Sequence, residues 1–352
     1  MKILYILLSF VYILSIEIEF NDKIQDFIEY TKKYNKEYPT KEEFQKRYQI
    51  WKQNFYKIES TNKNPLITPL SYLKISPVLK FKIPTVSYRV NKFTDLTKEE
   101  FSSKYLTFSD ESIKDLPIKT SHELGIDDIK GEEIPENFDW EFDRGIITKI
   151  KDQGSCGACF AFATVGIVQS QYLKNYGENI SFSEQQIIDC DELSYGCGGG
   201  NFKKTFTYLK NNGLMKEEDY PYIMKQGNCY FNESKSLTKV KNFAFLPKDE
   251  EEMKKYLYRN GPIVAGMNAN ILAFYDKGII EPLEFENCSD KINHAVLIVG
   301  YGVDKESGKK YWRIKNSMGQ DWGEDGYFKL LRGEGICKIN TYVAMAEIQK
   351  LK

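Results

Sequence analysis

The chain contains one cysteine placed where a thiol could act as a nucleophile. Cys159 stands directly before an apolar stretch, residues 160–172, which is long enough and apolar enough all round to predict a buried helix. Gly154, Ser155 and Gly157 precede it as turn and capping residues. A thiol at a helix N-terminus lies near unpaired N–H groups and the positive end of the helix dipole, and both favour the thiolate. The sequence therefore predicts an activated nucleophile at Cys159.

Two other interpretations of this cysteine stay open at this point. A cysteine in an apolar segment is often an inert core thiol. Cys156 and Cys159 also form a C-x-x-C pair, which is typical of thiol–disulfide oxidoreductases. The partners that the rest of the chain offers must decide between these possibilities.

A cysteine nucleophile needs a base, and histidine is the usual one. His122 lies in a polar stretch, whereas His294 opens an apolar run that predicts a buried strand. His294 alone could equally be a structural residue. Asn316, at the end of another predicted strand, can accept a hydrogen bond from an imidazole while staying neutral. The Gln153 amide and the backbone N–H of Cys159 could form an oxyanion hole.

The composition is that of an ordinary globular protein and excludes several functions. Of 352 residues, 41% are hydrophobic and 28% charged, and the net charge is −1 with dispersed basic residues, so no nucleic-acid surface is expected. With two histidines in the chain, we expect no metal site, and no cofactor. Residues 3–16 are almost entirely apolar after Lys2, which predicts a secretory signal peptide over 1–16, with a buried N-terminal helix as the alternative.

The N-terminal third is predicted to contain helices joined by connecting segments. Apolar residues recur every three or four positions over residues 21–64, which predicts amphipathic helix. Residues 65–87 carry four prolines and predict a loop. Thr97 and Glu100 form a capping box for a short helix. Residues 109–133 are acidic and polar and predict a flexible linker.

From residue 134 the pattern changes, and it indicates one compact domain with two halves. It is mainly helical up to about residue 225 and alternates short apolar runs with turns beyond about residue 238. The predicted strands are residues 263–267, 295–299, 311–314 and 327–331. We expect a detachable N-terminal segment in front of a catalytic domain.

All seven cysteines fall within residues 156–337. On a secretory route, clustered cysteines predict disulfides, and an odd number leaves one thiol free or paired with another chain. Three sequons are candidate glycosylation sites, and their asparagines are Asn179, Asn232 and Asn287.

Three motifs together resemble the papain-like cysteine proteases, most closely the cathepsin L type. Residues 153–160, Gln-Gly-Ser-Cys-Gly-Ala-Cys-Phe, are similar to the active-site run of that family. Residues 293–295 and 315–327 are similar to its other two signatures. Residues 134–140 resemble the usual mature N-terminus.

The N-terminal part resembles the inhibitory prosegment of the same family. Its interspersed helical motif is matched by Glu43, Arg47, Trp51, Asn54, Ile58 and Asn62, and its second motif by Asn91, Phe93 and Asp95. Arg89 departs from the second motif, where glycine is expected, and no counterpart is recognised for residues 64–86.

The resemblance implies an α+β fold: a papain-like two-lobed catalytic domain, with a helical lobe and a β-barrel-like lobe, preceded by a helical propeptide. The implied domains are a signal peptide (1–16), an inhibitory propeptide (17–133) and the catalytic domain (134–352). A Cys159 thiolate and a His294 imidazolium would hydrolyse peptide bonds in a secreted or lysosomal endopeptidase made as a zymogen. The implied partners are protein or peptide substrates, the chain's own propeptide and cystatin-type inhibitors, for a mature monomer that is not on a membrane.

The resemblance also implies disulfides and a substrate pocket. The pairs would be Cys156–Cys197, Cys190–Cys229 and Cys288–Cys337, which leaves Cys159 free and makes a redox pair uneconomical. The substrate-binding residues carried over by position are Gly199, Gly200, Gly266, Ile292, Ala295 and Tyr342. Their small and apolar side chains predict a preference for apolar substrate side chains.

In the catalytic part of the chain, Phe160 and Met318 stand where the family usually has tryptophan. They motivate an alternative, a catalytically silent protein of this fold that serves recognition. The presence of Cys159, His294 and Asn316 opposes that alternative.

Overall fold

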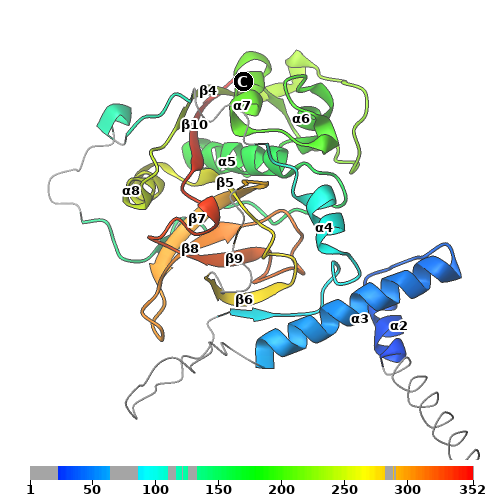
Figure 1. The fold of residues 1–352 in the computed structure, drawn as a ribbon. Coiled ribbons are helices and arrows are strands. Elements are labelled where there is room, and N and C mark those ends of the chain that lie inside the picture. The colour runs from blue at the N-terminus through cyan, green and yellow to red at the C-terminus, as the bar shows by residue number, and fades with distance from the viewer. Residues whose placement is uncertain are drawn as a thin grey trace, which may run out of the picture. The chain divides into compact units, whose positions relative to one another are not determined.

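A computed structural model describes most of the chain (Figure 1). The described residues are 23–63, 86–109, 116–120, 122–125, 133–281, 288 and 291–351. They form two compact units: a smaller one of residues 1–64 and 89–97, and a larger one of residues 65–88 and 98–352. The expected signal peptide, most of the 65–87 stretch and the sequon residue Asn287 lie outside the described residues.

The smaller unit is built on two helices, α2 (Ile24–Lys33) and α3 (Lys41–Lys63). Their apolar stripes meet in an aromatic core of Phe27, Tyr30, Tyr48 and Trp51. The ring of Phe27 lies 5.5 Å from that of Trp51 and 5.9 Å from that of Tyr30. The apolar residues that recur with helical spacing in residues 21–64 therefore pack into a core of their own.

Residues 89–97 pack onto these helices through Asp95, which is buried. Its carboxylate accepts hydrogen bonds from Tyr30 Oη at 2.7 Å and Tyr38 Oη at 2.9 Å, and pairs with Lys36 Nζ at 2.8 Å. Arg47 Nη1 donates to the Asp95 carbonyl at 3.0 Å. The two motifs noted in the N-terminal sequence thus meet at Asp95, through the backbone carbonyl that Arg47 binds.

The larger unit has short helices around one long buried helix. The long helix is α5 (Cys159–Tyr176), and the others are α4 (Lys98–Tyr105), η3 (His122–Leu124), α6 (Glu184–Cys190), η4 (Gly196–Gly198), α7 (Phe202–Asn212), η5 (Glu233–Lys235), α8 (Glu250–Asn260) and η6 (Ile336–Lys338). Side chains cap the N-termini of α6 (Ser183), α7 (Asn201) and α8 (Asp249), and Asn232 caps η5. Among the described residues, no helix is both long and apolar enough to cross a bilayer.

The strands of the larger unit join one sheet of the order β1-β6-β9-β8-β7-β5-β10-β4-β3, with β2 beside β7. Their bounds are β1 (Val86–Tyr88), β2 (Phe138–Asp139), β3 (Leu214–Met215), β4 (Ser236–Phe245), β5 (Ile263–Met267), β6 (Tyr275–Ile280), β7 (His294–Val303), β8 (Lys310–Lys315), β9 (Tyr327–Leu331) and β10 (Tyr342–Lys350). Only β6 and β9 pair in parallel; the other described pairs of strands are antiparallel.

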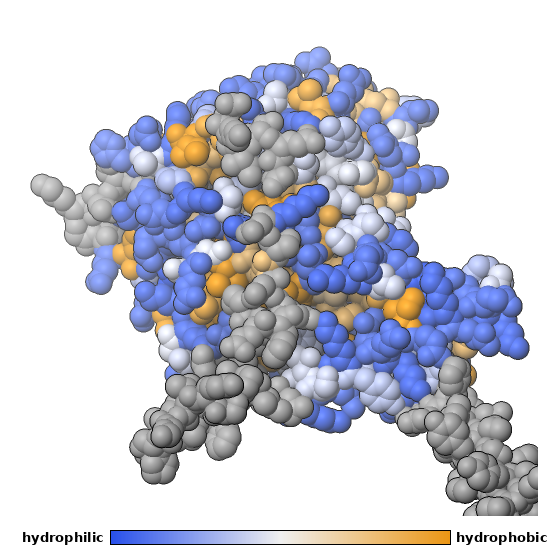
Figure 2. Space-filling view, viewed as in Figure 1, coloured by the Kyte–Doolittle hydropathy of each residue, from blue (hydrophilic) through white to orange (hydrophobic). Residues whose placement is uncertain are grey.

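Helix α5 packs against β7 and β10, as Figure 1 shows, and its first fourteen residues are buried. The predicted helical and β halves are thus joined through one shared core, and the expected α+β class is confirmed. On the face seen in Figure 2, hydrophobic residues gather only in small patches among hydrophilic ones.

Two stretches that were predicted to be irregular contain regular pairing. Val86–Tyr88, at the end of the expected 65–87 loop, forms β1 and pairs with β6. Ile118, in the expected linker, makes a parallel bridge with Phe245. In both places, a short segment without a clear strand pattern pairs with the edge of a strand from elsewhere in the chain. The local sequence pattern does not reveal such pairing.

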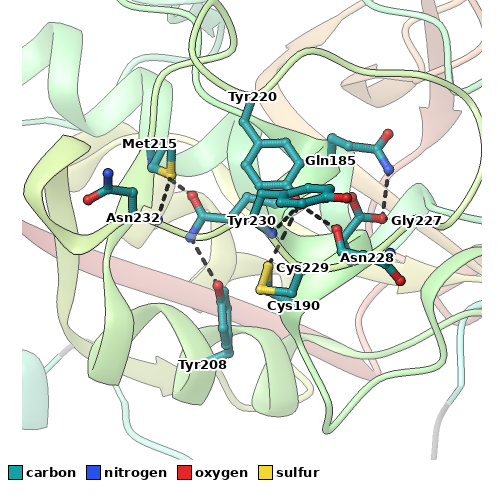
Figure 3. The surroundings of a disulfide bond; sticks show 12 residues. Gln185, Cys190, Tyr208, Met215, Tyr220, Gly227, Asn228, Cys229, Tyr230 and Asn232 are labelled. Carbon is teal, nitrogen blue, oxygen red and sulfur yellow. Dashed lines mark hydrogen bonds between the residues drawn. A yellow bond between two sulfur atoms is a disulfide. The ribbon is translucent and has the colours of Figure 1, made fainter.

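Three disulfides join Cys156 to Cys197, Cys190 to Cys229 and Cys288 to Cys337. These are the pairs that the resemblance implied. Beside Cys190–Cys229, the Tyr220 hydroxyl donates to an Asp189 oxygen at 3.0 Å. The same hydroxyl accepts from the Tyr230 N–H at 3.0 Å (Figure 3). This disulfide is therefore embedded in a hydrogen-bonded network at the helical end of the unit.

Candidate active site

Cys159 is the first residue of α5 and the only cysteine outside the disulfides. The N-cap residue is Ala158, which has no side-chain cap, so the first-turn N–H groups are not taken by a capping side chain. The disulfide between Cys156 and Cys197 fixes the turn that leads into the helix. It also removes Cys156 as a redox partner, which leaves Cys159 as a lone thiol.

His294 opens β7, and Asn316 directly follows β8, the neighbouring strand. The imidazole Nε2 donates to Asn316 Oδ1 at 2.9 Å. Asn316 Oδ1 also accepts from the Ser317 N–H at 2.9 Å, which holds the amide in place. His294 is fully buried, and its Nδ1 has no hydrogen-bond partner in the part of the chain that the structure describes. Nδ1 is thus the ring atom left to exchange a proton.

Gln153 lies in the turn before α5 and is fully buried. Its Oε1 accepts from Ser317 Oγ at 2.6 Å, and its Nε2 donates to the Cys156 carbonyl at 3.1 Å and the Tyr105 carbonyl at 3.3 Å. Ser317 therefore connects Gln153 to the His294–Asn316 pair. Sequence reasoning assigned Ser317 no role, although it lies inside one of the recognised motifs.

The backbone of Ala295, the residue after His294, lies close enough to the Cys159 sulfur to favour its thiolate form, as does the backbone of Thr107. Burial nevertheless raises the pKa of the Cys159 thiol to about 11, because these backbone groups do not offset the loss of water. Burial also lowers the pKa of His294 to about 4, although the Asn316 hydrogen bond and the nearby Tyr105 backbone oppose the shift. In this state both groups are neutral over the range between these values.

Residues 105–109, which we call the covering segment, lie directly over these groups. Thr107 Oγ1 donates to the Gly157 carbonyl at 2.6 Å. The Phe108 N–H donates to the Asn293 carbonyl at 2.9 Å, and the Ser109 N–H to the Gly200 carbonyl at 3.0 Å. The covering segment thus hydrogen-bonds to both sides of the site, the α5 side and the β7 side. The resemblance implied that the prosegment blocks the site, but sequence reasoning did not say which of its residues would lie here.

Five of the six predicted substrate-binding residues lie around the covering segment. Phe108, 3% exposed, packs with its ring 5.5 Å from that of Tyr342. A Cβ at Gly266 would lie 2.9 Å from both Phe108 and Ile292, and a Cβ at Gly199 would overlap the Thr107 carbonyl. The remaining neighbours are Gly200, bonded to Ser109, and Phe202, whose ring is 4.8 Å from Phe108 and which the sequence did not single out.

The sixth of these residues, Ala295, lies instead at the thiol. Gly199, Gly200 and Gly266 carry no side chains, so the walls of the predicted substrate pocket leave room for an extended chain. What fills the space in this state is the apolar side chain of Phe108.

Phe160 and Met318 are buried. The sequon residues Asn179 and Asn232 are exposed, and Asn232 accepts hydrogen bonds from Ser234 in its own sequon. His122 lies exposed on η3.

The chain is similar to known proteins over nearly its whole length. A family model described as papain family cysteine protease matches residues 134–347, and one described as cathepsin propeptide inhibitor domain matches residues 27–101. A viral cathepsin of Adoxophyes honmai nucleopolyhedrovirus is 37% identical over 88% of this chain and 87% of its own length.

A second relative, probable cysteine protease RD19D of Arabidopsis thaliana, is 35% identical over 90% of this chain and 84% of its own length. Among solved structures, the digestive procathepsin L2 proteinase of Tenebrio molitor larval midgut superposes with a TM-score of 0.78 at 31% identity. That match covers 92% of this chain and 98% of the other.

Proposed function

Because the chain belongs to the papain family of cysteine proteases, we propose that Cys159, His294, Asn316 and Gln153 form its catalytic site. The chain is a cysteine endopeptidase in zymogen form, with its own propeptide. The observation that carries the assignment is the His294–Asn316 hydrogen bond beside a free thiol that the Ala295 backbone contacts.

The proposed reaction begins with proton transfer from Cys159 to His294 Nδ1, the ring nitrogen that has no hydrogen-bond partner among the described residues. The thiolate attacks the carbonyl carbon of a peptide bond and forms a tetrahedral oxyanion. The Gln153 amide and the Cys159 N–H stabilise that oxyanion, and each such donor contributes about 3 kcal/mol. His294 then protonates the leaving amine and activates a water molecule that releases the acyl group.

Asn316 has a positioning role in this scheme. Its Oδ1 accepts from Nε2, so it selects the tautomer and the ring orientation without adding a charge to the thiolate–imidazolium pair. Ser317 does the same for Gln153 by donating to its Oε1. The Nε2 hydrogen that now goes to the Tyr105 carbonyl can then go to the oxyanion once that carbonyl has left.

The contacts of the covering segment support the proposal that this part of the propeptide inhibits the zymogen. Its Tyr105 carbonyl accepts from the Gln153 amide, where the scheme requires the oxyanion. Its Phe108 fills the apolar pocket at Tyr342, which supports a preference for apolar substrate side chains. We assign residues 1–16 to a signal peptide, 17–133 to the inhibitory propeptide and 134–352 to the catalytic domain.

The remaining assignments follow from the family and the expected leader. We propose a secretory route that ends in a lysosome, a lysosome-like vacuole or the extracellular space, with glycosylation at Asn179, Asn232 and Asn287. The mature enzyme would be a monomer that cuts proteins and peptides and is bound by cystatin-type inhibitors.

The test is digestion of a peptide library by the acid-matured protein and by its Cys159→Ala variant. We expect cleavage at sites with an apolar side chain for the Phe108 pocket, and none with the variant. A catalytically silent protein would cleave nothing and would react slowly with iodoacetamide at pH 5, whereas an ion-paired thiolate reacts rapidly. Absence of cleavage together with slow alkylation would therefore overturn the proposal.

A further inference from the structure

The last residue of β4, Phe245, has its backbone groups directed away from β10. Its N–H donates to the Pro117 carbonyl at 3.1 Å, and its carbonyl accepts from the Lys119 N–H at 2.8 Å. The next residue, Leu246, donates instead to the Val343 carbonyl, next to β10's Ala344, at 2.9 Å. Phe245 is thus an edge position, and residues 116–120 are the strand that covers it, in parallel, at Ile118.

One side chain of this segment contributes to the contact. Leu116 is half-buried and packs against the main apolar core. The residues that follow are exposed, and Ile118 is 55% exposed. Pro117 lacks an N–H, but its carbonyl is the group that Phe245 uses. Recognition therefore depends on two backbone hydrogen bonds and one apolar side chain, which is the pattern of strand addition to a sheet edge.

The segment has a defined end. The N–H and the hydroxyl of Thr120 both donate to Glu123, at 2.8 Å and 3.0 Å, and the Glu123 N–H donates back to Thr120 Oγ1 at 3.2 Å. This reciprocal arrangement begins the 3₁₀ turn η3, so the extended conformation stops at Thr120.

The β4 edge is separate from the catalytic groups but adjacent to the substrate pocket. The ring of Phe245 lies 5.0 Å from that of Tyr342, which in turn packs on Phe108 of the covering segment. Within the larger unit, three described parts of the assigned propeptide therefore contact the catalytic domain: β1 pairs with β6, the covering segment lies over the thiol, and residues 116–120 lie at the β4 edge.

We propose that the edge of β4 at Phe245 is a further docking site for the prosegment, separate from the covering segment, which accepts an extended segment in parallel with an apolar side chain at the Leu116 position. The proposal rests on the proposed function, in that residues 116–120 belong to the part removed on maturation. A cut between the covering segment and residues 116–120 allows the covering segment to leave the thiol and leaves residues 116–120 docked, because they remain joined to the catalytic domain. Maturation then has two separable steps: opening of the site, and release of the β4 edge.

The experiment measures amide hydrogen exchange in the full-length Cys159→Ala zymogen, which cannot process itself. We expect the Phe245 and Lys119 amides to be protected, and Leu116→Ser to speed the exchange of both by about tenfold. The matched control Ile118→Ser changes a side chain that is mostly exposed, and should leave both rates unchanged.

A second variant, Lys119→Pro, removes the N–H that donates to Phe245 and should speed Phe245 exchange by a similar factor, with the melting temperature of the catalytic domain unchanged. Phe245 exchange that is unaffected by Leu116→Ser and Lys119→Pro would overturn the proposal, as would an equal response to Ile118→Ser. The readout needs no catalysis, so failure of the proposed function would not affect it.

Discussion

The carbonyl oxygen of Tyr105 lies 3.3 Å from Nε2 of Gln153 and accepts its hydrogen bond. The backbone of Thr107, two residues on, lies near the Cys159 sulfur. The covering segment thus approaches the two groups that the proposed mechanism needs first, the oxyanion donor and the nucleophile. On the proposed function, this segment would inhibit chemically as well as sterically, because the thiol and the imidazole that it covers are buried and neutral.

The reactivity of Cys159 should differ sharply between the zymogen and the mature protein. Burial raises the pKa of the thiol to about 11 in the zymogen, so at pH 7 almost none of it is thiolate. Removal of the propeptide returns water and a charged partner to the sulfur. We expect iodoacetamide to alkylate the mature form at least about a hundred times faster at pH 7. Equal rates would show that the covering segment does not control the thiol; Cys159→Ser serves as the blank.

Acid should loosen the covering segment through His294. Burial in the docked state lowers the pKa of this imidazole to about 4, whereas a solvated histidine has a pKa of about 6.5. In the Cys159→Ala zymogen no thiolate is present to hold a proton on the ring, so above pH 6.5 the ring is neutral in both states and docking is unaffected. As the pH falls from 6.5 to 4, the undocked ring becomes protonated while the docked ring stays neutral. Docking therefore weakens, by about 3 kcal/mol in total.

Exchange of the Phe108 amide, corrected for its intrinsic rate, measures this effect in the Cys159→Ala zymogen. The amide should become less protected between pH 6.5 and pH 4, and protection should level off below pH 4. In His294→Asn the protection should not depend on pH over this range. A slope that survives in this variant would assign the acid response to other groups.

Phe108 should contribute most of the side-chain affinity of the covering segment. Truncation of a buried phenylalanine to alanine costs about 3–5 kcal/mol. Phe108→Ala should therefore shorten the half-time of acid activation and release activity from the uncut zymogen. Ser109→Ala is the matched control, since it keeps the backbone N–H that bonds to Gly200. If both variants activate at the same rate as the parent, the pocket is not a docking determinant.

Ser317 should affect kcat more than KM. Ser317→Ala removes the hydroxyl that holds Gln153 Oε1, so the amide is no longer fixed for the oxyanion. Loss of one buried hydrogen bond of about 1 kcal/mol or more predicts a fall in kcat of about tenfold in the matured enzyme. Ser317→Thr keeps a hydroxyl and should restore most of the rate. A purely structural role would instead lower the melting temperature in both variants.

The catalytic groups were accessible from sequence because each stands at the end of a strongly patterned element. Cys159 begins a buried helix, and His294 and Asn316 lie at the ends of adjacent strands, so the pattern located them at the ends of elements, and the family resemblance then gave their expected roles. Strands 263–267 and 327–331 were predicted with the bounds that β5 and β9 have. Where apolar alternation is weaker, as in β4 and β10, the sequence did not reveal the strands.

What sequence pattern did not show is where one segment lies against another. The covering segment follows a helix and has no periodicity of its own, so its contacts with Gly157, Asn293 and Gly200 depend entirely on tertiary structure. The same holds for Phe202, which reaches the pocket from the first turn of α7, and for residues 116–120 at the β4 edge.

Phe108 belongs to the same polypeptide as the pocket that it fills. While the chain is intact, this occupant is supplied at a fixed local concentration that dilution cannot reduce. Once the peptide bond behind it is cut, the occupant becomes an ordinary ligand that can diffuse away and be outcompeted. The uncut protein should therefore stay inactive at any dilution, whereas the freshly cut protein should gain activity faster when it is diluted.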